Sequence, residues 1–338
     1  RPRPLSLIRM PSFGRLGKIL LGLAVSAGLL VYFFWDVDLR VVGARLRETL
    51  WTYLALSVGL GFVSIWLRAV RWYYLFPPGA RPSHLFRALM IGYMGNNLLP
   101  LRAGELVRVY VVTRRGQRFG TAFATVVVER VLDGLSVGLI VAALLLVVPV
   151  PASVRWSIVV FLLADLAGIV VLVAIAAAPG TCRGLIQWLF RRVGWLERRL
   201  LGLLDTMIEG LRGVQAAGHT GPIVAYSVGI WLVLALSFWT ALHAAHLDLP
   251  LAAAWTLLAF LGLGVSLPSS PGFVGVIQAA TVLALALFAV PRTEALSFSL
   301  LLHASQFFPI TIVGLLYLLV EHVSLADATR GAVAAPER

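Results

Sequence analysis

The chain has 338 residues, of which 60% are hydrophobic and only 13% are charged. Soluble globular domains carry about a quarter charged residues, so this composition excludes a water-soluble protein and predicts an all-α polytopic membrane protein. The formal net charge is +13, but the basic residues lie between apolar runs, which argues against nucleic acid and favours anionic lipid headgroups as partners.

Long apolar runs predict about six full membrane spans, because crossing the hydrocarbon core takes about 20 helical residues. The first run has no small-residue cleavage site after it, so we expect a retained span rather than a signal peptide. In chain order the predicted spans cover residues 17–35, 51–67, 121–149, 154–178, 222–245 and 295–320.

The end of the second span and the segment after the fourth span have compositions that predict where they lie relative to the membrane. The second span is expected to end at Arg68 and Arg71, with an aromatic belt at the membrane interface formed by Trp72, Tyr73 and Tyr74. Residues 183–213 alternate apolar side chains with arginines and glutamates. They predict a cytoplasmic amphipathic linker, either lying on the membrane surface or solvated.

The distribution of arginine predicts the orientation. The N-terminal tail and the stretches 68–118 and 180–220 are rich in arginine, whereas the loops between them carry few. By the positive-inside rule the three rich regions are cytoplasmic. This places both termini in the cytoplasm and the chain in the inner membrane of a prokaryote.

Two further apolar segments, 85–113 and 251–290, are broken by proline and glycine. The arginine count puts both ends of each segment on one face, so we expect re-entrant hairpins entering from opposite faces; an interfacial helix pair is the alternative for the first. Proline ends helices, and the freed carbonyls must line protein or a water-filled cavity. The residues expected to break the helices are Pro100 and Gly104 in the first segment and Pro268, Pro271, Gly272 and Gly275 in the second.

Both breaks read Leu-Pro-x-x-x-Gly, and each lies between two full spans. Residues 51–149 and 222–320 therefore predict an inverted-topology repeat within a single transmembrane domain, residues 1–338. Broken segments at matching positions of inverted repeats point to the central site of a transporter. Chance recurrence in a chain rich in leucine and glycine is the alternative.

The predicted span 121–149 contains Glu129, Arg130 and Asp133. Charged side chains cost about 3 kcal/mol each at the centre of a span. Glu129 and Asp133 share a helical face, and Arg130 can pair with either. The cluster predicts a polar site in the protein interior or a self-neutralised group near the cytoplasmic end.

A second charged cluster, Arg102, Glu105 and Arg108, follows the first break at spacings of three. Arginine makes bidentate contacts with phosphate and carboxylate groups. Two arginines on a hairpin that dips into the membrane therefore predict a lipid-phosphate site; the alternative is an interfacial salt bridge.

Neutral polar residues in the second half complete the candidate set. His303 and Gln306 lie three residues apart in the last span. They predict either a neutral histidine hydrogen-bonded to a neighbouring helix or a proton-relay or headgroup contact. Gln278 is expected to cap the polar lining of the second break. No nucleotide-binding or hydrolase motif occurs, so we expect no enzymatic activity, metal or cofactor.

Three motifs in order carry a resemblance to a known family. Residues 97–105 (Asn-Leu-Leu-Pro-Leu-Arg-Ala-Gly-Glu) with Arg108 resemble the N-x-x-P-x-R-x-G-E-x-x-R signature of the flippase-like integral membrane family, which includes the transmembrane region of lysylphosphatidylglycerol synthase. Residues 129–133 resemble its E-R-x-x-D motif, and residues 267–275 resemble its L-P-x-x-P-G-G-x-G motif. The resemblance covers about residues 17–320.

The resemblance implies a lipid-translocating domain. Multidomain relatives move aminoacylated phosphatidylglycerol outward, and stand-alone relatives are linked to glycolipids, isoprenoid-linked lipids or hopanoids. No aminoacyl-transferase domain accompanies this chain, so lipid aminoacylation is not expected of it. Gln278 and His303 stand where relatives often carry Glu and Arg, so the headgroup preference is expected to differ.

We therefore expect a flippase that moves an anionic phospholipid, glycolipid or isoprenoid-type lipid through a cavity between the two hairpins. The alternatives are a proton- or ion-coupled carrier of a small polar solute, a lipid-modifying enzyme with His303 as base, and a non-transporting partner of a lipid-synthesis enzyme. A second copy of the chain is a further candidate partner. Because residues 249–291 hold no charge, the cavity is expected to be electrostatically lopsided. The expected substrate-binding residues are Asn97, Arg102, Glu105, Arg108, Glu129, Arg130, Asp133, Gln278, His303 and Gln306.

Overall fold

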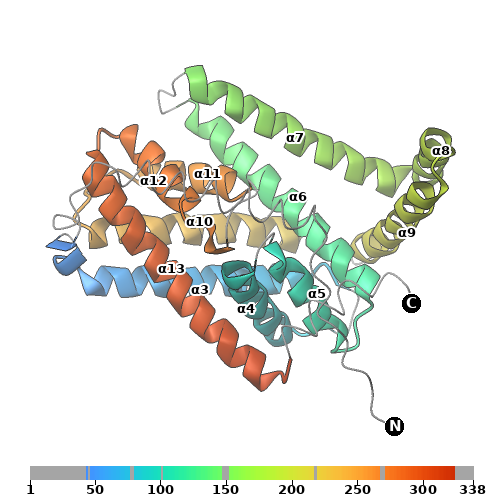
Figure 1. Ribbon diagram of the computed structural model, residues 1–338, viewed down its shortest axis with the longest axis horizontal. Coiled ribbons are helices and arrows are strands. Elements are labelled where there is room, and N and C mark those ends of the chain that lie inside the picture. Colours follow the sequence, from blue (N-terminus) through green and yellow to red (C-terminus); the bar gives the residue numbers. More distant parts are fainter. Residues whose placement is uncertain are drawn as a thin grey trace, which may run out of the picture.

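The computed structural model is helical throughout the part of the chain that it describes (Figure 1). It describes residues 43–44, 46–76, 80–99, 102–146, 152–216, 219–266 and 271–323. The elements are α3 (Trp51–Tyr73), α4 (Pro82–Leu98), α5 (Gly104–Thr113), α6 (Phe119–Leu144), α7 (Ala152–Ala177), α8 (Pro179–Phe190), α9 (Gly194–Ala216), α10 (Thr220–Ala244), α11 (Leu251–Ser266), the 3-10 turn η2 (Pro271–Phe273), α12 (Val276–Ala286) and α13 (Arg292–Val320).

The all-helical prediction is confirmed for these residues. The predicted span at 17–35 and the two prolines Pro100 and Pro268 lie outside them. By length and composition, three described helices can each cross a membrane: α3, α10 and α13. A fourth crossing results if Leu166–Ala177 and Pro179–Phe190, which meet at a bend of 112°, are counted as one span. The helix α6 is 26 residues long but carries three charged residues near its middle.

The helices α3 and α10 form the most extensive contact in the bundle and run antiparallel. At one end the Leu50 nitrogen donates to the Ala244 carbonyl at 2.9 Å, and at the other Tyr74 lies against His219 at 5.0 Å between ring centroids. In the middle, the hydroxyls of Ser57 and Ser237 each donate to the other residue's carbonyl at 2.8 Å. Since apolar helices gain little from the hydrophobic effect inside lipid, such close hydrogen-bonded contacts hold them together.

The first broken segment forms a tight helical hairpin. The helices α4 and α5 have 17 and 10 residues, about 25 and 15 Å at 1.5 Å per residue, whereas the hydrocarbon core is about 30 Å thick. A Cβ added to Gly104 would overlap the Gly92 carbonyl, and one added to Gly95 would lie 2.9 Å from the Gly104 Cα. Glycines therefore let the two backbones touch.

The second broken segment has the same plan. The helix α11 ends before η2, and α12 returns along it, so that a Cβ on Gly264 would lie 3.1 Å from the Val276 side chain. Gly272 and Gly275 take left-handed φ angles of 69° and 85°, which glycine adopts without steric cost. The predicted interruptions of both apolar segments thus occur as helix–break–helix units.

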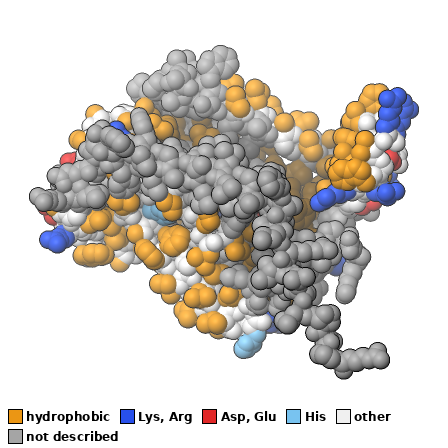
Figure 2. Space-filling model, in the orientation of Figure 1, with side chains coloured by type: hydrophobic (Ala, Val, Ile, Leu, Met, Phe, Trp, Pro, Cys, Tyr) orange, Lys and Arg blue, Asp and Glu red, His pale blue; other side chains and the backbone are white. Residues whose placement is uncertain are grey.

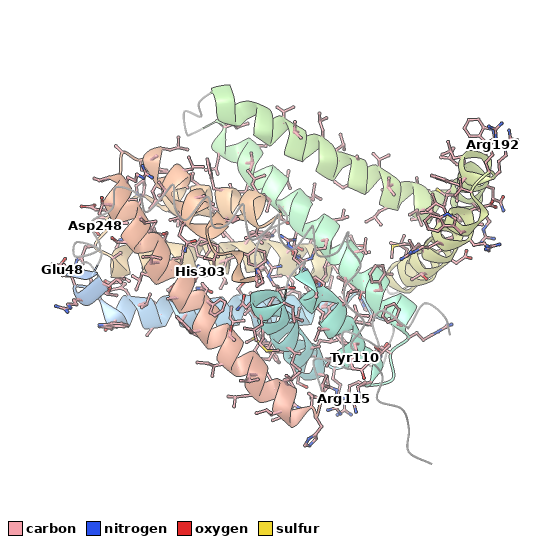
Figure 3. The ribbon with its side chains drawn as sticks, in the orientation of Figure 1. Glu48, Tyr110, Arg115, Arg192, Asp248 and His303 are labelled. Carbon is pink, nitrogen blue, oxygen red and sulfur yellow. The ribbon has the colours of Figure 1, made fainter. Side chains whose placement is uncertain are left out.

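The two broken segments meet inside the bundle. The turn η2 contacts α4, and α13 packs across α4 so closely that a Cβ on Gly314 would overlap the Met90 carbonyl. Figure 3 places His303 on α13 between the two ends of the bundle, with Glu48 and Asp248 towards one end and Tyr110 and Arg115 towards the other. The breaks therefore lie between the ends of the molecule.

The predicted linker at 183–213 forms α8 and α9, which stand at one side of the bundle beyond α7 (Figure 1). The helix α9 packs against α6, but α8 has no buried residue. Its Leu185, Trp188 and Leu189 are exposed. Figure 2 shows a patch of apolar side chains on this arm, with basic side chains beside it.

Candidate functional site

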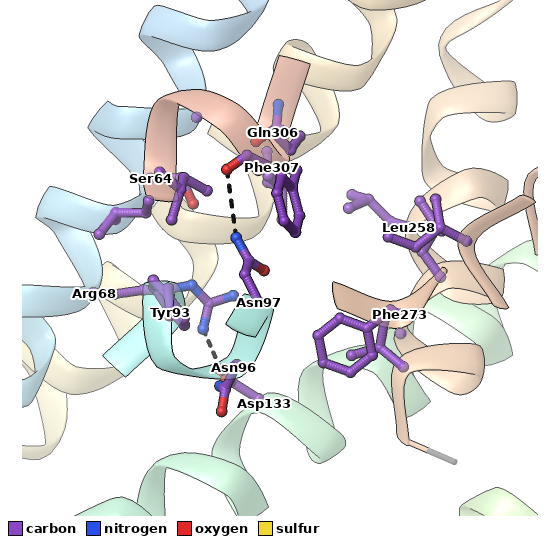
Figure 4. Close-up of a pocket in the computed structure, with 18 of the residues that line it drawn as sticks. Ser64, Arg68, Tyr93, Asn96, Asn97, Asp133, Leu258, Phe273, Gln306 and Phe307 are labelled. Carbon is purple, nitrogen blue, oxygen red and sulfur yellow. Dashed lines mark hydrogen bonds and ion pairs between the residues drawn. The ribbon is translucent and has the colours of Figure 1, made fainter. Parts of the chain in front are cut away.

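A cavity of about 590 Å³ lies where the two broken segments meet, lined by residues of α3, α4, α5, α6, α10, α11, η2, α12 and α13 (Figure 4). Asn97 at the end of α4 donates to the Thr311 hydroxyl at 2.9 Å and lies against the Phe307 carbonyl at 3.4 Å. The backbone oxygen of Asn97 also faces Gly272, where a Cβ would approach it to 3.3 Å. The first break thus contacts both the second break and the last described helix, α13.

The cavity has a charged half and an apolar half. Its charged lining residues come from α3, the first broken segment and α6, and its large apolar ones come mainly from α10, α11 and η2. Figure 4 shows Leu258 and Phe273 across the cavity from Arg68 and Asp133. This is the lopsided arrangement expected from the sequence. The charged residues are Arg68, Arg102, Glu105, Arg130 and Asp133, and the apolar ones include Trp231, Leu234, Phe238, Leu258, Leu261, Val265, Phe273 and Ile277.

Asp133 on α6 is the first centre of a buried ion-pair network. One of its oxygens accepts from Arg68 at 2.7 Å and the other from Arg71 at 2.8 Å. Arg71 is fully buried and also donates to the Ser227 hydroxyl on α10 at 3.2 Å. This network joins α3, α6 and α10.

Glu129, one turn earlier on α6, is the second centre. It accepts from Arg108 at 2.7 Å and lies 3.5 Å from Arg71. Arg108 also pairs with Glu105 at 2.6 Å and lies over the ring of Trp72 at 4.8 Å. Because carboxylates and guanidiniums alternate, each buried charge that these contacts involve has an opposite charge beside it, as burial requires.

The prediction that Trp72 lies in an interfacial aromatic belt is wrong. The helix α3 continues to Tyr73, Arg71 and Trp72 are fully buried, and the Trp72 indole donates to the Thr125 hydroxyl at 2.9 Å. Hydropathy treats an arginine as a boundary, but here the carboxylates of α6 compensate its charge inside the bundle.

The carboxylates of α6 are also not neutralised chiefly by Arg130, their neighbour in sequence. Arg130 approaches Asp133 only to 3.8 Å and Glu105 to 3.6 Å, and 39% of its side chain is exposed. The closer partners of Glu129 and Asp133 come from α3 and α5. A cluster neutralised within α6 alone is therefore excluded.

Arg102 differs from the other arginines of the site. It has a left-handed φ of 53°, a conformation that costs a non-glycine residue about 1 kcal/mol or more. Its guanidinium lies 5.6 Å from the centroid of the Phe273 ring on η2. Within the described residues it makes no ion pair.

The polar residues of the second half form one hydrogen-bonded chain. The Gly275 nitrogen donates to Gln278 Oε1 at 2.8 Å, which leaves the Gln278 amide nitrogen facing His303 Nδ1 at 3.0 Å. An amide nitrogen only donates, so Nδ1 of His303 accepts. This arrangement fits a neutral histidine that holds the second break against α13.

At the end of the bundle marked by Arg115, Glu321 joins three helices. It follows α13 and pairs with Arg115 of the α5 end at 2.6 Å and with Arg87 of α4 at 3.2 Å. Burial acts to raise the pKa of Glu321, but the hydrogen bonds from Arg115 and Arg87 outweigh it and hold that pKa below its ordinary value.

The structure brings most of the predicted site residues to the cavity. Arg108, Glu129 and Gln278 are at most 2% exposed and lie behind its wall. Tyr93, Asn96, Trp231 and Phe307 also line the cavity but were not expected from the sequence. The predicted residues that line the cavity are Asn97, Arg102, Glu105, Arg130, Asp133, Gly272, His303 and Gln306.

Apolar helices around a charged cavity define an integral membrane protein. A family model, the lysylphosphatidylglycerol synthase TM region, matches residues 19–314, so the chain belongs to this family, as the three motifs indicated. No curated protein and no solved structure matches the chain.

Proposed function

We propose that this protein is a lipid flippase that moves an anionic phospholipid, glycolipid or isoprenoid-type lipid across the bilayer. The cavity between the two broken segments carries the proposal, because its charged half suits a headgroup and its apolar half suits the adjoining hydrocarbon. A cavity of about 590 Å³ is of the size that binds small ligands, about 300–1,000 Å³. The chain would act on the lipid without changing it covalently.

The fold supports an inverted repeat as the framework of this cavity. The helix α3 and the hairpin α4–α5 of the first unit precede α6, just as α10 and the hairpin α11–α12 precede α13. The first helices of the two units, α3 and α10, run antiparallel. The proposed flippase would have six spans if the predicted first span, α6 and α7 also cross the bilayer. Its orientation in the inner membrane rests on the arginine distribution in the sequence.

The ion-pair network disfavours proton-coupled transport as the alternative. A proton carrier needs a carboxylate that exchanges protons, yet Glu105, Glu129 and Asp133 each lie within 2.8 Å of a guanidinium. An adjacent guanidinium stabilises the ionised form of a carboxylate. Transport of a lipid that carries its own charge requires no such proton exchange.

The test is reconstitution into liposomes with a lipid labelled on one leaflet, followed by quenching of the label from outside. We expect the protein to accelerate loss of asymmetry over empty liposomes. The matched protein control is Trp188→Ala, which alters an exposed residue of α8 outside the cavity and should transport like the wild type. No acceleration with any of several headgroups would remove the proposal.

A further inference from the structure

The charges around the cavity do not balance. Among the described residues, Arg68, Arg71, Arg102, Arg108 and Arg130 lie in or directly behind its wall. They face only three carboxylates. Five guanidiniums against three carboxylates leave two positive charges without a counter-charge.

The contacts identify the two surplus cations. Arg68, Arg71 and Arg108 each have a carboxylate oxygen within 2.8 Å. Arg130 comes no closer than 3.6 Å to a carboxylate, and Arg102 makes no ion pair with any described residue. The surplus therefore belongs to Arg102 and Arg130.

Both surplus arginines line the same cavity, and like charges repel each other. The opposite wall is apolar, so water alone screens them poorly, and a bound anion would relieve the repulsion. Guanidinium groups bind phosphate oxygens through paired, charge-assisted hydrogen bonds. A phosphate that enters between these two side chains would meet donors from both.

We propose that Arg102 and Arg130 form a phosphate-binding site that selects lipids whose headgroup carries two negative charges. A phosphomonoester or diphosphate lipid is preferred over a phosphodiester lipid with one charge, and zwitterionic and cationic headgroups are disfavoured. The reason is charge matching: a phosphate monoester carries about −1.5 to −2 at neutral pH and so cancels the surplus. The inference rests on the proposed lipid transport and names its substrate class.

The test compares three lipids with identical acyl chains in the same liposome assay: phosphatidic acid, phosphatidylglycerol and phosphatidylcholine. We expect transport rates to fall in that order, with about a tenfold difference between the first and the last. Phosphatidylglycerol moving as fast as phosphatidic acid would overturn the selection of a double charge. Equal rates for all three lipids would overturn the charge-selective site while leaving lipid transport intact, whereas no transport at all would overturn the proposed function itself.

Variants assign the selection to the two arginines. Arg102→Gln and Arg130→Gln should each slow phosphatidic acid about tenfold and change phosphatidylcholine less than twofold. Arg102→Lys keeps the charge but loses the paired donors, so it should transport the three lipids in the same order of rates but more slowly. It replaces Arg102→Gln in the test if the glutamine variant does not fold. The matched control is Arg183→Gln, which removes an exposed arginine on α8 that pairs with Asp205. If it reduces selectivity as much as Arg102→Gln and Arg130→Gln do, the site assignment is wrong.

A free phosphate ion has the same chemistry as the headgroup, and one further arm separates the two. Liposomes with the protein reconstituted in their membrane are incubated with radiolabelled inorganic phosphate. We expect no uptake above empty liposomes, because the apolar half of the cavity would remain unfilled. Phosphate uptake without lipid transport would overturn the lipid assignment.

Discussion

Asp133→Asn tests whether the buried ion-pair network holds the bundle together. Asp133 accepts from Arg68 at 2.7 Å and from Arg71 at 2.8 Å. The amide keeps the shape of the side chain but removes its charge. Arg71, which is fully buried, would then retain only Glu129 at 3.5 Å and the Ser227 hydroxyl at 3.2 Å.

Breaking a buried ion pair by removing one partner costs about 3–5 kcal/mol, because it leaves an uncompensated charge. With an unfolding entropy of about 2.1 cal/mol/K per residue, that cost lowers the unfolding midpoint of a chain of this length by about 4–7 °C. The assay is thermal unfolding of the purified protein in one detergent, followed by tryptophan fluorescence and by the fraction that stays monodisperse.

The control makes the same substitution where the pair is exposed. Asp205 pairs with Arg183, and both side chains are at least half exposed, so Asp205→Asn should cost less than about 1 kcal/mol. Adding Arg71→Met to Asp133→Asn removes the fully buried one of the two guanidiniums that lose this carboxylate and should recover part of the loss. Equal midpoints for Asp133→Asn and Asp205→Asn would refute the network as a source of stability.

Three further substitutions test other parts of the structure, each by the same unfolding measurement. Gly104→Ala should destabilise the protein by about 1–3 kcal/mol or more, because the added methyl group overlaps the α4 backbone. Gly59→Ala is the control and should be neutral, because nothing lies within 4 Å of the new atom. Equal losses of stability in the two variants would contradict the close approach of α4 and α5. His303→Ala should lower the free energy of unfolding by about 1–3 kcal/mol, because it leaves the Gln278 amide without its acceptor. An unchanged midpoint would show that this hydrogen bond does not hold the second break in place. Glu321→Gln should lower the midpoint at pH 7 by an amount equivalent to about 1 kcal/mol. Because the folded-state pKa of Glu321 is depressed, its contribution is present above the unfolded value of about 4.3 and disappears as the pH falls through the folded value, so wild type and variant should converge in acid. A difference that persists unchanged at pH 3 would exclude that carboxylate as its source.

The sequence was sufficient to locate the breaks, because what breaks a helix is local. Proline lacks a backbone donor and glycine tolerates left-handed backbone, so Gly272 and Gly275, which both have positive φ angles, could be recognised without knowing their neighbours. The charged cluster on α6 was equally visible, since a carboxylate inside an apolar run is expensive wherever the run folds. Both features depend on residues close together in the chain.

The partners of those charges could not be predicted, because pairing depends on tertiary structure. Arg71 and Asp133 are 62 residues apart, and nothing local distinguishes an arginine that ends a span from one that continues into a buried ion pair. The residues that form the apolar wall of the cavity could not be predicted from the sequence for a similar reason. Leu258 and Phe238 face the cavity, yet in sequence they look like the lipid-facing leucines and phenylalanines around them.

The position of Arg102 links recognition of the headgroup to the contact between the two broken segments. The charged half of the cavity is held by ion pairs of 2.6–2.8 Å within the first unit. The first break also touches the second unit directly: the Asn97 amide donates to Thr311 on α13, and the Arg102 guanidinium lies over the Phe273 ring. An anion bound by Arg102 would compete with the Phe273 ring for its guanidinium, whereas the ion pairs of the network already have carboxylate partners.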